Sequence, residues 1–370
     1  MKSHSFMIKP ASSLCNMRCR YCFYSDISIS REIPSHGIMS HDTADKIIDN
    51  IFKSITGMSE ITFGFQGGEP TLAGLSWFRH FVDYVTIRKG NISVRYTFQT
   101  NGLLLDESWC TFFRENNFLI GLSIDGGKRF HNRNRICSED NGTYEICLRS
   151  KELLEKSGVE YNILCVLIND LAKEPEKVWH FIMNENIRYI QFIPCLEPLF
   201  SELHRADGNI LRPMLFAQFY SRLLPLWIRE LEKGNYVSVK FFDDIVNYFC
   251  KNIPTSCGID GRCNNQCVIE ADGSVYPCDF YAVDSYKLGN LSEMALHDIF
   301  IADKFHNFIM ESPKLSKNCT LCHFFPKCRG GCKRMRNVMY AGATGTVCGF
   351  RSFLEKCLAP LEYTARKVFQ

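Results

Sequence analysis

The sequence predicts an α/β fold in which a partial (β/α)6 barrel is followed by a small cysteine-rich domain. Two observations favour this fold class. Apolar runs of strand length alternate with amphipathic helical stretches over the first two thirds of the chain, and cysteines, glycines and short turns dominate most of the remainder. Strands that alternate with helices in this way form right-handed βαβ units and a parallel sheet. At 370 residues the chain is long enough for two domains.

Six strands and the helices between them account for the first part. The expected strands are Ser5–Pro10, Ile61–Gln66, Val94–Thr100, Leu119–Ile124, Tyr161–Val166 and Tyr189–Pro194. The expected helices are Asp42–Thr56, Leu75–Arg88, Glu107–Asn116, Tyr144–Ser157, Pro175–Asn184 and Leu215–Glu232. Six units fall two short of a complete eight-stranded barrel, so we expect a barrel open on one side, which would admit a bulky molecule such as a polypeptide.

The last of these helices ends at Lys233-Gly234-Asn235, a sequence typical of a helix C-cap. We therefore expect a barrel domain over residues 1–235 and a second domain over residues 236–370, which ends in a C-terminal helix. The second segment has little apolar periodicity before that helix, so metal clusters are expected to stabilise it.

Composition excludes several classes of protein. The net charge of only +3 gives no electrostatic reason to expect a nucleic-acid or membrane partner. No apolar run is long enough to span a bilayer and the N-terminus lacks a signal-peptide core, so we expect a cytoplasmic protein. Nineteen cysteines without a sign of secretion indicate metal ligation rather than disulfides.

Three cysteines near the start of the chain have a C-x3-C-x2-C spacing: Cys15, Cys19 and Cys22. Three thiolates can hold three irons of a [4Fe–4S] cluster and leave the fourth iron open to a small molecule. A partial zinc site is the alternative. With the aromatic Tyr21 directly before the third cysteine, the run resembles the signature of radical SAM enzymes. That resemblance implies that S-adenosylmethionine binds the open iron and is cleaved to a 5′-deoxyadenosyl radical.

A second group of cysteines follows residue 256. From Cys263 the spacing is C-x9-G-x4-C, from Cys319 it is C-x2-C-x5-C-x3-C, and Cys348 follows after a gap. A pair of structural zinc knuckles would also use C-x2-C spacings, but zinc would not account for the N-terminal triad. The pattern resembles the SPASM domain, whose full members carry two auxiliary [4Fe–4S] clusters.

The resemblance implies three [4Fe–4S] clusters in all and distributes the ligands of the two auxiliary ones. Auxiliary I would be held by Cys257, Cys263, Cys278 and Cys332, and Auxiliary II by Cys319, Cys322, Cys328 and Cys348. Cys267 lies outside the family spacing and receives no role. The cysteines in apolar or helical settings are expected to be core residues: Cys110, Cys147, Cys165 and Cys195.

The run Gln66-Gly67-Gly68-Glu69-Pro70 resembles the GGEP motif of radical SAM enzymes, which receives the amino group of the methionine moiety. Two glycines let the main chain approach a ligand closely, and a carboxylate accepts from an ammonium group. Arg135 is the family-like partner of the carboxylate or ribose, with Arg133 and Arg149 in competition. The resemblance therefore implies these contacts to S-adenosylmethionine: Tyr21, Gly68, Glu69, Ser123, Arg135 and Leu196.

A narrower resemblance covers nearly the whole chain. The segments KPASSLCNMRCRYCFY, FQGGEPTLAGL, QTNG, LDESW, GLSIDG, YNILCV and DGSVYPCDFY resemble those of the anaerobic sulfatase-maturating enzymes. This family implies oxidation of a cysteine or serine in a C/S-x-P/A-x-R segment of a sulfatase polypeptide to Cα-formylglycine. It also implies an electron donor such as flavodoxin or ferredoxin.

Asp279 follows the predicted ligand Cys278 and is the expected catalytic residue beyond the radical itself. Its carboxylate would take the proton of the target thiol or hydroxyl. Tyr24 and Gln66 are candidates for orienting the peptide, with packing as the alternative for both.

Two alternative functions remain at this stage. A SPASM peptide maturase that forms thioether or carbon–carbon crosslinks would share both cysteine patterns. Such enzymes usually carry an N-terminal peptide-recognition domain, which we do not expect because the first strand begins near Met1. The other alternative is a non-enzymatic iron–sulfur or zinc scaffold, which would need neither the GGEP run nor a three-cysteine site.

Overall fold

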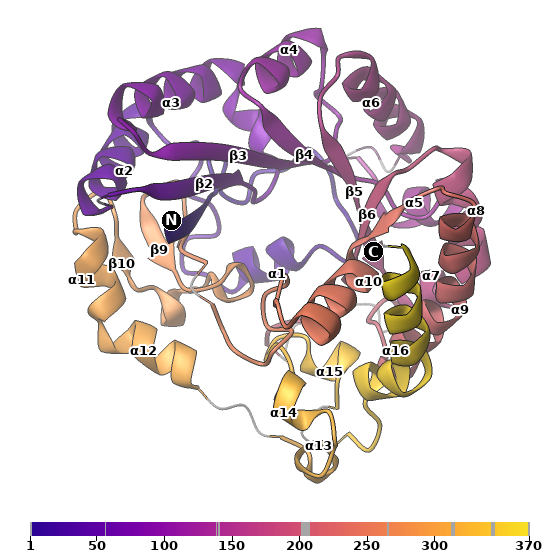
Figure 1. Cartoon of the computed structure of the whole chain (residues 1–370). Helices are drawn as coiled ribbons and strands as arrows, with labels where there is room; N and C mark the ends of the chain where they lie inside the picture. The colour runs from indigo at the N-terminus through magenta and orange to yellow at the C-terminus, as the bar shows by residue number, and fades with distance from the viewer. Residues whose placement is uncertain are drawn as a thin grey trace. The chain divides into compact units, whose positions relative to one another are not determined.

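The structure, a computed structural model, describes residues 2–55, 57–137, 139, 141–200, 208–264, 266–311, 315–341 and 345–368 (Figure 1). The chain forms two compact units, and each of them is described by itself. Unit 1 comprises Met1–Ser123, Arg135–Tyr161 and Asn265–Glu311. Unit 2 comprises Ile124–Asn134, Asn162–Asn264 and Ser312–Gln370.

Four parallel strands form the main part of the sheet in unit 1. They are β1 (Lys2–Ile8), β2 (Ser59–Phe65), β3 (Ser93–Thr100) and β4 (Phe118–Ser123). Within this unit the strand order is β10-β9-β8-β1-β2-β3-β4. Ile8 pairs with Phe65, and Phe65 with Phe98, so the residues that follow β1, β2 and β3 lie at one edge of the sheet.

Three short strands from the cysteine-rich part of the chain extend this sheet. They are β8 (Val268–Ile269), β9 (Ser274–Tyr276) and β10 (Gly289–Asn290). β8 pairs with β1 in parallel, and β9 and β10 follow it in antiparallel pairings. The pairing explains why Asn265–Glu311 belongs to unit 1 although it lies far from the other segments in sequence.

The helices of unit 1 include α2, α3 and α4, which lie beside the strands β2, β3 and β4 in Figure 1. Their bounds are α1 (Phe23–Ile29), α2 (His41–Ser54), η1 (Pro70–Ala73), α3 (Leu75–Arg88), α4 (Glu107–Glu115), α6 (Tyr144–Lys156), η3 (Asp279–Tyr281), η4 (Asp284–Tyr286), α11 (Leu296–Ile301) and α12 (Asp303–Met310). Side-chain caps mark two helix starts, since Ser40 accepts from the Thr43 N–H and Asp106 from the Trp109 N–H. Phenylalanines such as Phe65 and Phe98 fill the space between sheet and helices.

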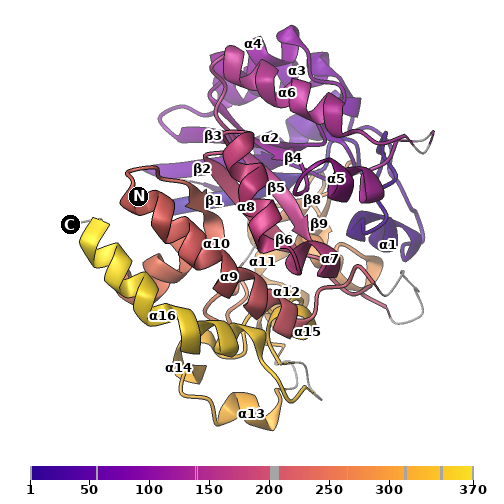
Figure 2. The same ribbon diagram turned by 90° about the vertical axis from the view of Figure 1, so that its right-hand side faces the viewer.

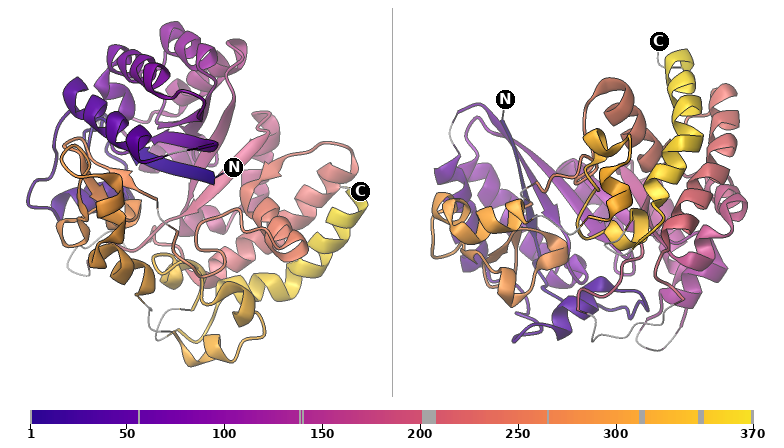
Figure 3. Two further views of the ribbon diagram at one scale, coloured as in Figure 1. Left: turned by 60° about the vertical axis from the view of Figure 1, so that its left-hand side comes forward. Right: turned by 90° about the horizontal axis from the view of Figure 1, so that it is seen from below.

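Unit 2 contains the parallel strands β5 (Tyr161–Leu167), β6 (Tyr189–Pro194) and β7 (Ser238–Val239). Its helices are α5 (Lys128–Asn134), α7 (Asn169–Ala172), α8 (Pro175–Asn184), α9 (Pro213–Glu232), α10 (Lys240–Ile245), η2 (Val246–Cys250), α13 (Lys317–Thr320), α14 (Phe325–Cys328), α15 (Arg336–Met339) and α16 (Gly349–Val368). The two longest, α9 and α16, lie side by side in Figures 2 and 3. A Cβ at Gly349 would stand 2.0 Å from the Pro213 carbonyl oxygen, which shows how closely the helix starts approach.

The six expected strands and the six expected helices of the first part are confirmed with shifts of at most a few residues at their ends, as is the C-terminal helix. α9 ends at Glu232, and Gly234 has φ +83°, the left-handed conformation expected after a helix end. The boundary at residue 235 and the closure of a six-stranded partial barrel stay predictions. No helix in the described ranges is both long and apolar enough to cross a membrane.

Candidate active site

The predicted triad Cys15, Cys19 and Cys22 lies on the loop between β1 and α1 in unit 1. A tight turn shapes the loop, because the Cys22 N–H donates to the Cys19 carbonyl oxygen at 3.1 Å. The Met17 N–H donates to Cys15 Sγ at 3.4 Å. Three thiols on one short loop are the donor set that a [4Fe–4S] cluster with one open iron requires.

The two glycines of the GGEP run allow this loop to approach the end of β2. The Gly68 N–H donates to the Ser12 carbonyl oxygen at 2.9 Å, and the Glu69 N–H to that of Leu14 at 2.7 Å. A Cβ at Gly68 would stand 2.0 Å from the Leu14 oxygen, too close for any side chain. The close approach of the main chain is therefore to the cysteine loop, and a contact of Gly68 with S-adenosylmethionine stays a prediction.

Glu69 is buried and already holds several parts of unit 1 together. Its Oε1 accepts from the N–H of Thr71 at 3.1 Å, the Thr71 hydroxyl at 2.7 Å and the Thr100 hydroxyl at 2.8 Å. Its Oε2 accepts from the Asn101 N–H at 2.8 Å. Burial raises the pKa of this carboxyl group in spite of these bonds. Its predicted role for the methionine amino group would have to use the remaining capacity of Oε2.

Asn101 is a residue of the site to which sequence reasoning gave no role. Its Nδ2 donates to Asn16 Oδ1 at 2.8 Å and lies 3.9 Å from Cys15 Sγ. Since Asn101 directly follows β3, it connects the end of that strand to the cysteine loop. The run QTNG after a predicted strand was the available signal.

Arg135 is the buried one among the three competing arginines. Its guanidinium carbon lies 5.5 Å from the ring centre of Tyr21, and both residues are buried. Arg149 is exposed. Arg133 is exposed too, and its Nη1 lies 2.6 Å from Asp170 Oδ2. The surroundings favour Arg135 for the predicted contact with S-adenosylmethionine, and Tyr21 lies beside it.

Ser123 and Leu196 are both buried at the ends of strands. Ser123 is the last residue of β4 in unit 1, and Leu196 follows β6 in unit 2. Their predicted contacts with S-adenosylmethionine stay predictions. Asp125, which also follows β4, has a structural partner, because its Oδ1 accepts from the Val166 N–H at 2.9 Å.

Asp279 is buried in unit 1, and a polar network surrounds its carboxylate. Oδ2 accepts from the Tyr24 hydroxyl at 2.6 Å and from Gln66 Nε2 at 3.0 Å. Oδ1 lies 2.9 Å from Lys9 Nζ. Burial and the negative charge of Asp279 raise the pKa of Tyr24, so that tyrosine remains a donor. Tyr24 and Gln66 thus contact the predicted proton acceptor directly.

Three further charged residues of this network received no role from the sequence. Lys9, Arg31 and Glu270 are all buried. Arg31 Nη2 lies 2.8 Å from Glu270 Oε1, and Lys9 Nζ lies 3.6 Å from the same oxygen. Burial alone would raise the pKa of Glu270, but Lys9 and Arg31 together hold it below its usual value. The only hint of this network in the sequence was a lysine, Lys9, near the end of the predicted strand SFMIKP.

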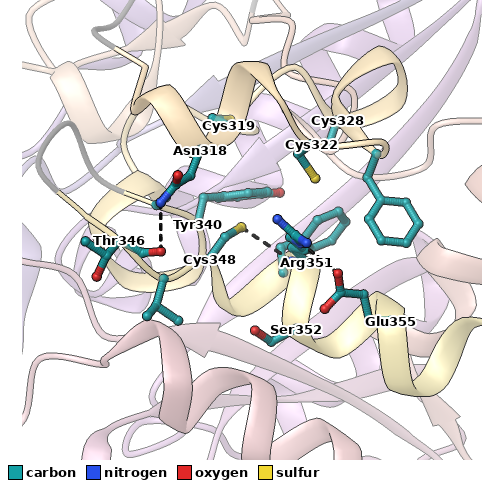
Figure 4. Close-up of a pocket in the computed structure, with 14 residues that line it drawn as sticks. Asn318, Cys319, Cys322, Cys328, Tyr340, Thr346, Cys348, Arg351, Ser352 and Glu355 are labelled. Atoms are coloured by element: carbon teal, nitrogen blue, oxygen red, sulfur yellow. Dashed lines mark hydrogen bonds and ion pairs between the residues drawn. The ribbon is translucent and has the colours of Figure 1, made fainter.

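The four cysteines predicted for Auxiliary II line one cavity of about 340 Å³ in unit 2 (Figure 4). Cys319 lies on α13 and Cys328 ends α14, whereas Cys322 lies between these two helices and Cys348 directly precedes α16. The Arg351 N–H donates to Cys348 Sγ at 3.4 Å, the kind of bond that stabilises a ligating thiolate. Burial raises the pKa of Cys328 to about 11, and a bound metal would favour the thiolate form of this side chain. The residues present fit a four-thiolate cluster.

The cysteines predicted for Auxiliary I are divided between the units. Cys257, Cys263 and Cys332 belong to unit 2, and Cys278 to unit 1. Within unit 2, a Cβ at Gly258 would stand 2.7 Å from Cys332 Cβ, so the Cys257 loop packs directly on Cys332. Desolvation and the neighbouring Cys332 and Cys263 raise the pKa of Cys257. This ligand set stays a prediction.

All nineteen cysteines lie in the described part of the chain, and none of these forms a disulfide. In the same ranges, no three or more His, Cys, Asp or Glu side chains are grouped closely enough to hold a single metal ion. The four cysteines predicted as core residues are confirmed as buried: Cys110, Cys147, Cys165 and Cys195. Cys267 is buried too, and its carbonyl oxygen accepts from the Met7 N–H at 3.0 Å.

Residues 10–182 match the Radical SAM superfamily, and residues 257–323 match SPASM, an iron–sulfur cluster-binding domain. The chain is 39% identical to a cysteine-type anaerobic sulfatase-maturating enzyme of Clostridium novyi (strain NT), over 99% of this chain and 98% of that protein. It is 30% identical to a serine-type enzyme of Bacteroides thetaiotaomicron, over 89% and 82%.

A solved structure of native anSMEcpe with bound AdoMet and Cp18Cys peptide superposes with a TM-score of 0.89 at 36% identity, covering 99% of both chains. Sequence and fold agree over almost the full length. The chain therefore belongs to the anaerobic sulfatase-maturating enzymes, a family of radical SAM oxidoreductases with a SPASM iron–sulfur domain.

Proposed function

We propose that this protein activates a sulfatase by oxidising one cysteine of its polypeptide to Cα-formylglycine. The observation that carries the proposal is the buried carboxylate of Asp279, which Tyr24 and Gln66 contact in the unit that also carries the Cys15 loop. Oxidation of a CH2–SH group to a thioaldehyde releases the thiol proton as well as a Cβ hydrogen atom, so it requires a proton acceptor near the radical-generating site.

Cysteine is the target we favour over serine. The cysteine-type relative is 39% identical to this chain and the serine-type relative 30%. The superposed structure with AdoMet holds a peptide named Cp18Cys. The target would lie in a C-x-P/A-x-R segment of the sulfatase, and we place the reaction in the cytoplasm.

When bound, S-adenosylmethionine and three [4Fe–4S] clusters supply two things: a radical, which takes one hydrogen atom from the target Cβ, and an acceptor for one further electron. Cys15, Cys19 and Cys22 would hold the cluster at which S-adenosylmethionine binds. Tyr21, Gly68, Glu69, Ser123, Arg135 and Leu196 would hold S-adenosylmethionine itself.

Asp279 takes the proton of the target thiol through Oδ2, the oxygen that Tyr24 and Gln66 contact. Loss of one hydrogen atom, one proton and one electron converts the CH2–SH group to a thioaldehyde. Water then replaces sulfur, which leaves as hydrogen sulfide, and the aldehyde of formylglycine remains. Tyr24 and Gln66 would orient the thiol towards the carboxylate.

An electron carrier such as flavodoxin or ferredoxin is the second partner. Between Glu311 and Glu355 the chain contains lysines and arginines but no acidic residue. This segment carries the cavity cysteines, and Leu321 beside Cys322 is 86% exposed. A segment with basic but no acidic residues and an exposed apolar side chain favours a small acidic protein as partner.

The test is anaerobic incubation of the cluster-reconstituted, reduced protein with S-adenosylmethionine and a peptide of about twenty residues that bears C-x-P-x-R. Formylglycine formation lowers the mass of the peptide by about 18 Da and yields one 5′-deoxyadenosine per conversion. A SPASM peptide maturase would instead lower the mass by about 2 Da through a crosslink. Deoxyadenosine without any change of the peptide would refute the proposed substrate.

A further inference from the structure

Lys9 is a buried lysine directly after β1, with 1% of its surface exposed. Removal of an ammonium group from water costs several kcal/mol unless carboxylates compensate its charge. Two carboxylates face Lys9 Nζ, Asp279 Oδ1 at 2.9 Å and Glu270 Oε1 at 3.6 Å. All three residues belong to unit 1.

The charges of this cluster pair in a definite way. Arg31 lies 2.8 Å from Glu270, closer than Lys9 does, and its Nε donates to the Ala282 carbonyl oxygen at 2.5 Å. Arg31 is therefore the principal partner of Glu270. Lys9 is left as the principal partner of Asp279, and the two positive and two negative groups balance.

The two oxygens of Asp279 have partners of different strength. Oδ1 faces the ammonium of Lys9, and Oδ2 accepts from the neutral donors Tyr24 and Gln66. Among the described residues Oδ1 accepts no hydrogen bond and is held by the charge of Lys9, an attraction that burial away from water strengthens. A substrate thiol can therefore displace a neutral donor at Oδ2 while Lys9 holds Oδ1 in place.

Lys9 also restrains Tyr24, since its Nζ lies 4.6 Å from the centre of the tyrosine ring. One ammonium group thus contacts both the carboxylate and the aromatic ring whose hydroxyl bonds to it. Gln66 completes the arrangement, because its Nε2 donates to the Tyr24 hydroxyl at 2.5 Å.

We propose that Lys9 is a positioning residue. Its ammonium group, which also contacts Glu270 and the Tyr24 ring, holds Oδ1 of Asp279 in place, so that Oδ2 is directed at the thiol of the target cysteine. This inference rests on the function proposed above. Lys9 itself does not exchange a proton with the substrate.

The experiment compares Lys9→Met with the wild-type holoenzyme on the C-x-P-x-R peptide. We expect formylglycine formation to fall about 10- to 100-fold, because displacement of a reacting group by about 1 Å has effects of this size. 5′-Deoxyadenosine should exceed formylglycine, because the substrate radical takes up an electron from the reductant and a proton from water, which restores the cysteine, before the thiol proton is removed. Iron content and the KM for S-adenosylmethionine should stay within twofold of wild type.

Lys151→Met is the matched control. Lys151 is a second buried lysine of unit 1 that pairs with a carboxylate, Glu155 at 2.9 Å, away from this network. We expect it to keep one deoxyadenosine per formylglycine. Lys9→Arg, which retains the charge, should recover a substantial part of the activity.

The double variant Lys9→Met/Glu270→Gln tests whether Lys9 acts by positioning Asp279 or only by balancing the buried charges. It removes one positive and one negative charge and leaves Arg31 and Asp279 to balance each other, so it should fold even if Lys9→Met does not. We expect this double variant still to form more 5′-deoxyadenosine than formylglycine, that is, to leave radical formation uncoupled from product formation. Restored coupling in the double variant, or normal coupling in Lys9→Met, would overturn the role of Lys9 alone. A wild-type protein that leaves the peptide unchanged would overturn the proposed function, and this inference with it.

Discussion

The network around Asp279 in unit 1 and the cysteine cavity in unit 2 are stabilised in opposite ways. Asp279 accepts hydrogen bonds from Tyr24 and Gln66 and forms an ion pair with Lys9. The cavity is lined by thiols, which are weak hydrogen-bond partners, and by short helices such as α13 and α14. The first region is held together by side chains of the protein, and we expect the second to depend on a bound cluster for stability.

The largest loss of activity should follow replacement of Cys19, the middle cysteine of the N-terminal triad. Cys19→Ala is expected to abolish S-adenosylmethionine cleavage, because two thiolates cannot hold the cluster with its open iron. 5′-Deoxyadenosine measured by chromatography should fall below detection. Cys267→Ala, which removes a buried cysteine of the same unit outside the predicted ligand sets, should retain cleavage.

Asp279→Asn should lower formylglycine formation about 10²- to 10⁴-fold, the range for loss of a general base. Lys9 keeps only Glu270 as a partner, at 3.6 Å, so we expect the melting temperature to fall, as calorimetry would measure, while the iron content changes little. Mass spectrometry of the peptide and iron analysis check the other two expectations. Asp272→Asn, which alters a partly exposed acid of the same segment, should stay within twofold of wild type. Unchanged activity of Asp279→Asn would contradict its role as proton acceptor.

Cys348→Ala should lower the iron content and the melting temperature of the protein. We expect about four irons fewer per chain and a melting temperature lower by about 5–10 °C, because a cluster that stabilises a loop-rich segment is lost. Iron analysis and calorimetry measure these changes. The matched control is Cys357→Ala on α16, a buried cysteine of the same unit that contacts Ser221. Equal iron in the two variants would show that Cys348 is no ligand.

The smallest effect is expected at Arg133, which lies outside both regions. Its exposed pair with Asp170 should contribute at most about 1 kcal/mol to the free energy of unfolding. Lys173 and then Arg133 lower the pKa of Asp170, so this stabilisation is present at neutral pH and is lost as the pH falls below about 4. Urea unfolding of Arg133→Ala at pH 7 and pH 3 measures it, and a larger loss at pH 3 would contradict the assignment.

The sequence by itself determined the order of strands and helices. The runs Tyr189–Pro194 and Leu75–Arg88 are confirmed to the residue, because hydrophobic periodicity is a local property. It also identified the family, since the cysteine spacings and the GGEP run are local motifs. The gathering of Cys319, Cys322, Cys328 and Cys348 around one cavity agrees with the ligand set that the family resemblance implied.

Only the tertiary structure decided which residues surround Asp279. Lys9, Arg31 and Glu270 lie far apart in the sequence, and nothing local shows that their charges meet. The pairing of β8 with β1 brings the segment of Glu270 and Asp279 to the end of the first strand. A buried lysine becomes favourable only when that pairing supplies its carboxylates, which is a property of the fold and not of any short segment.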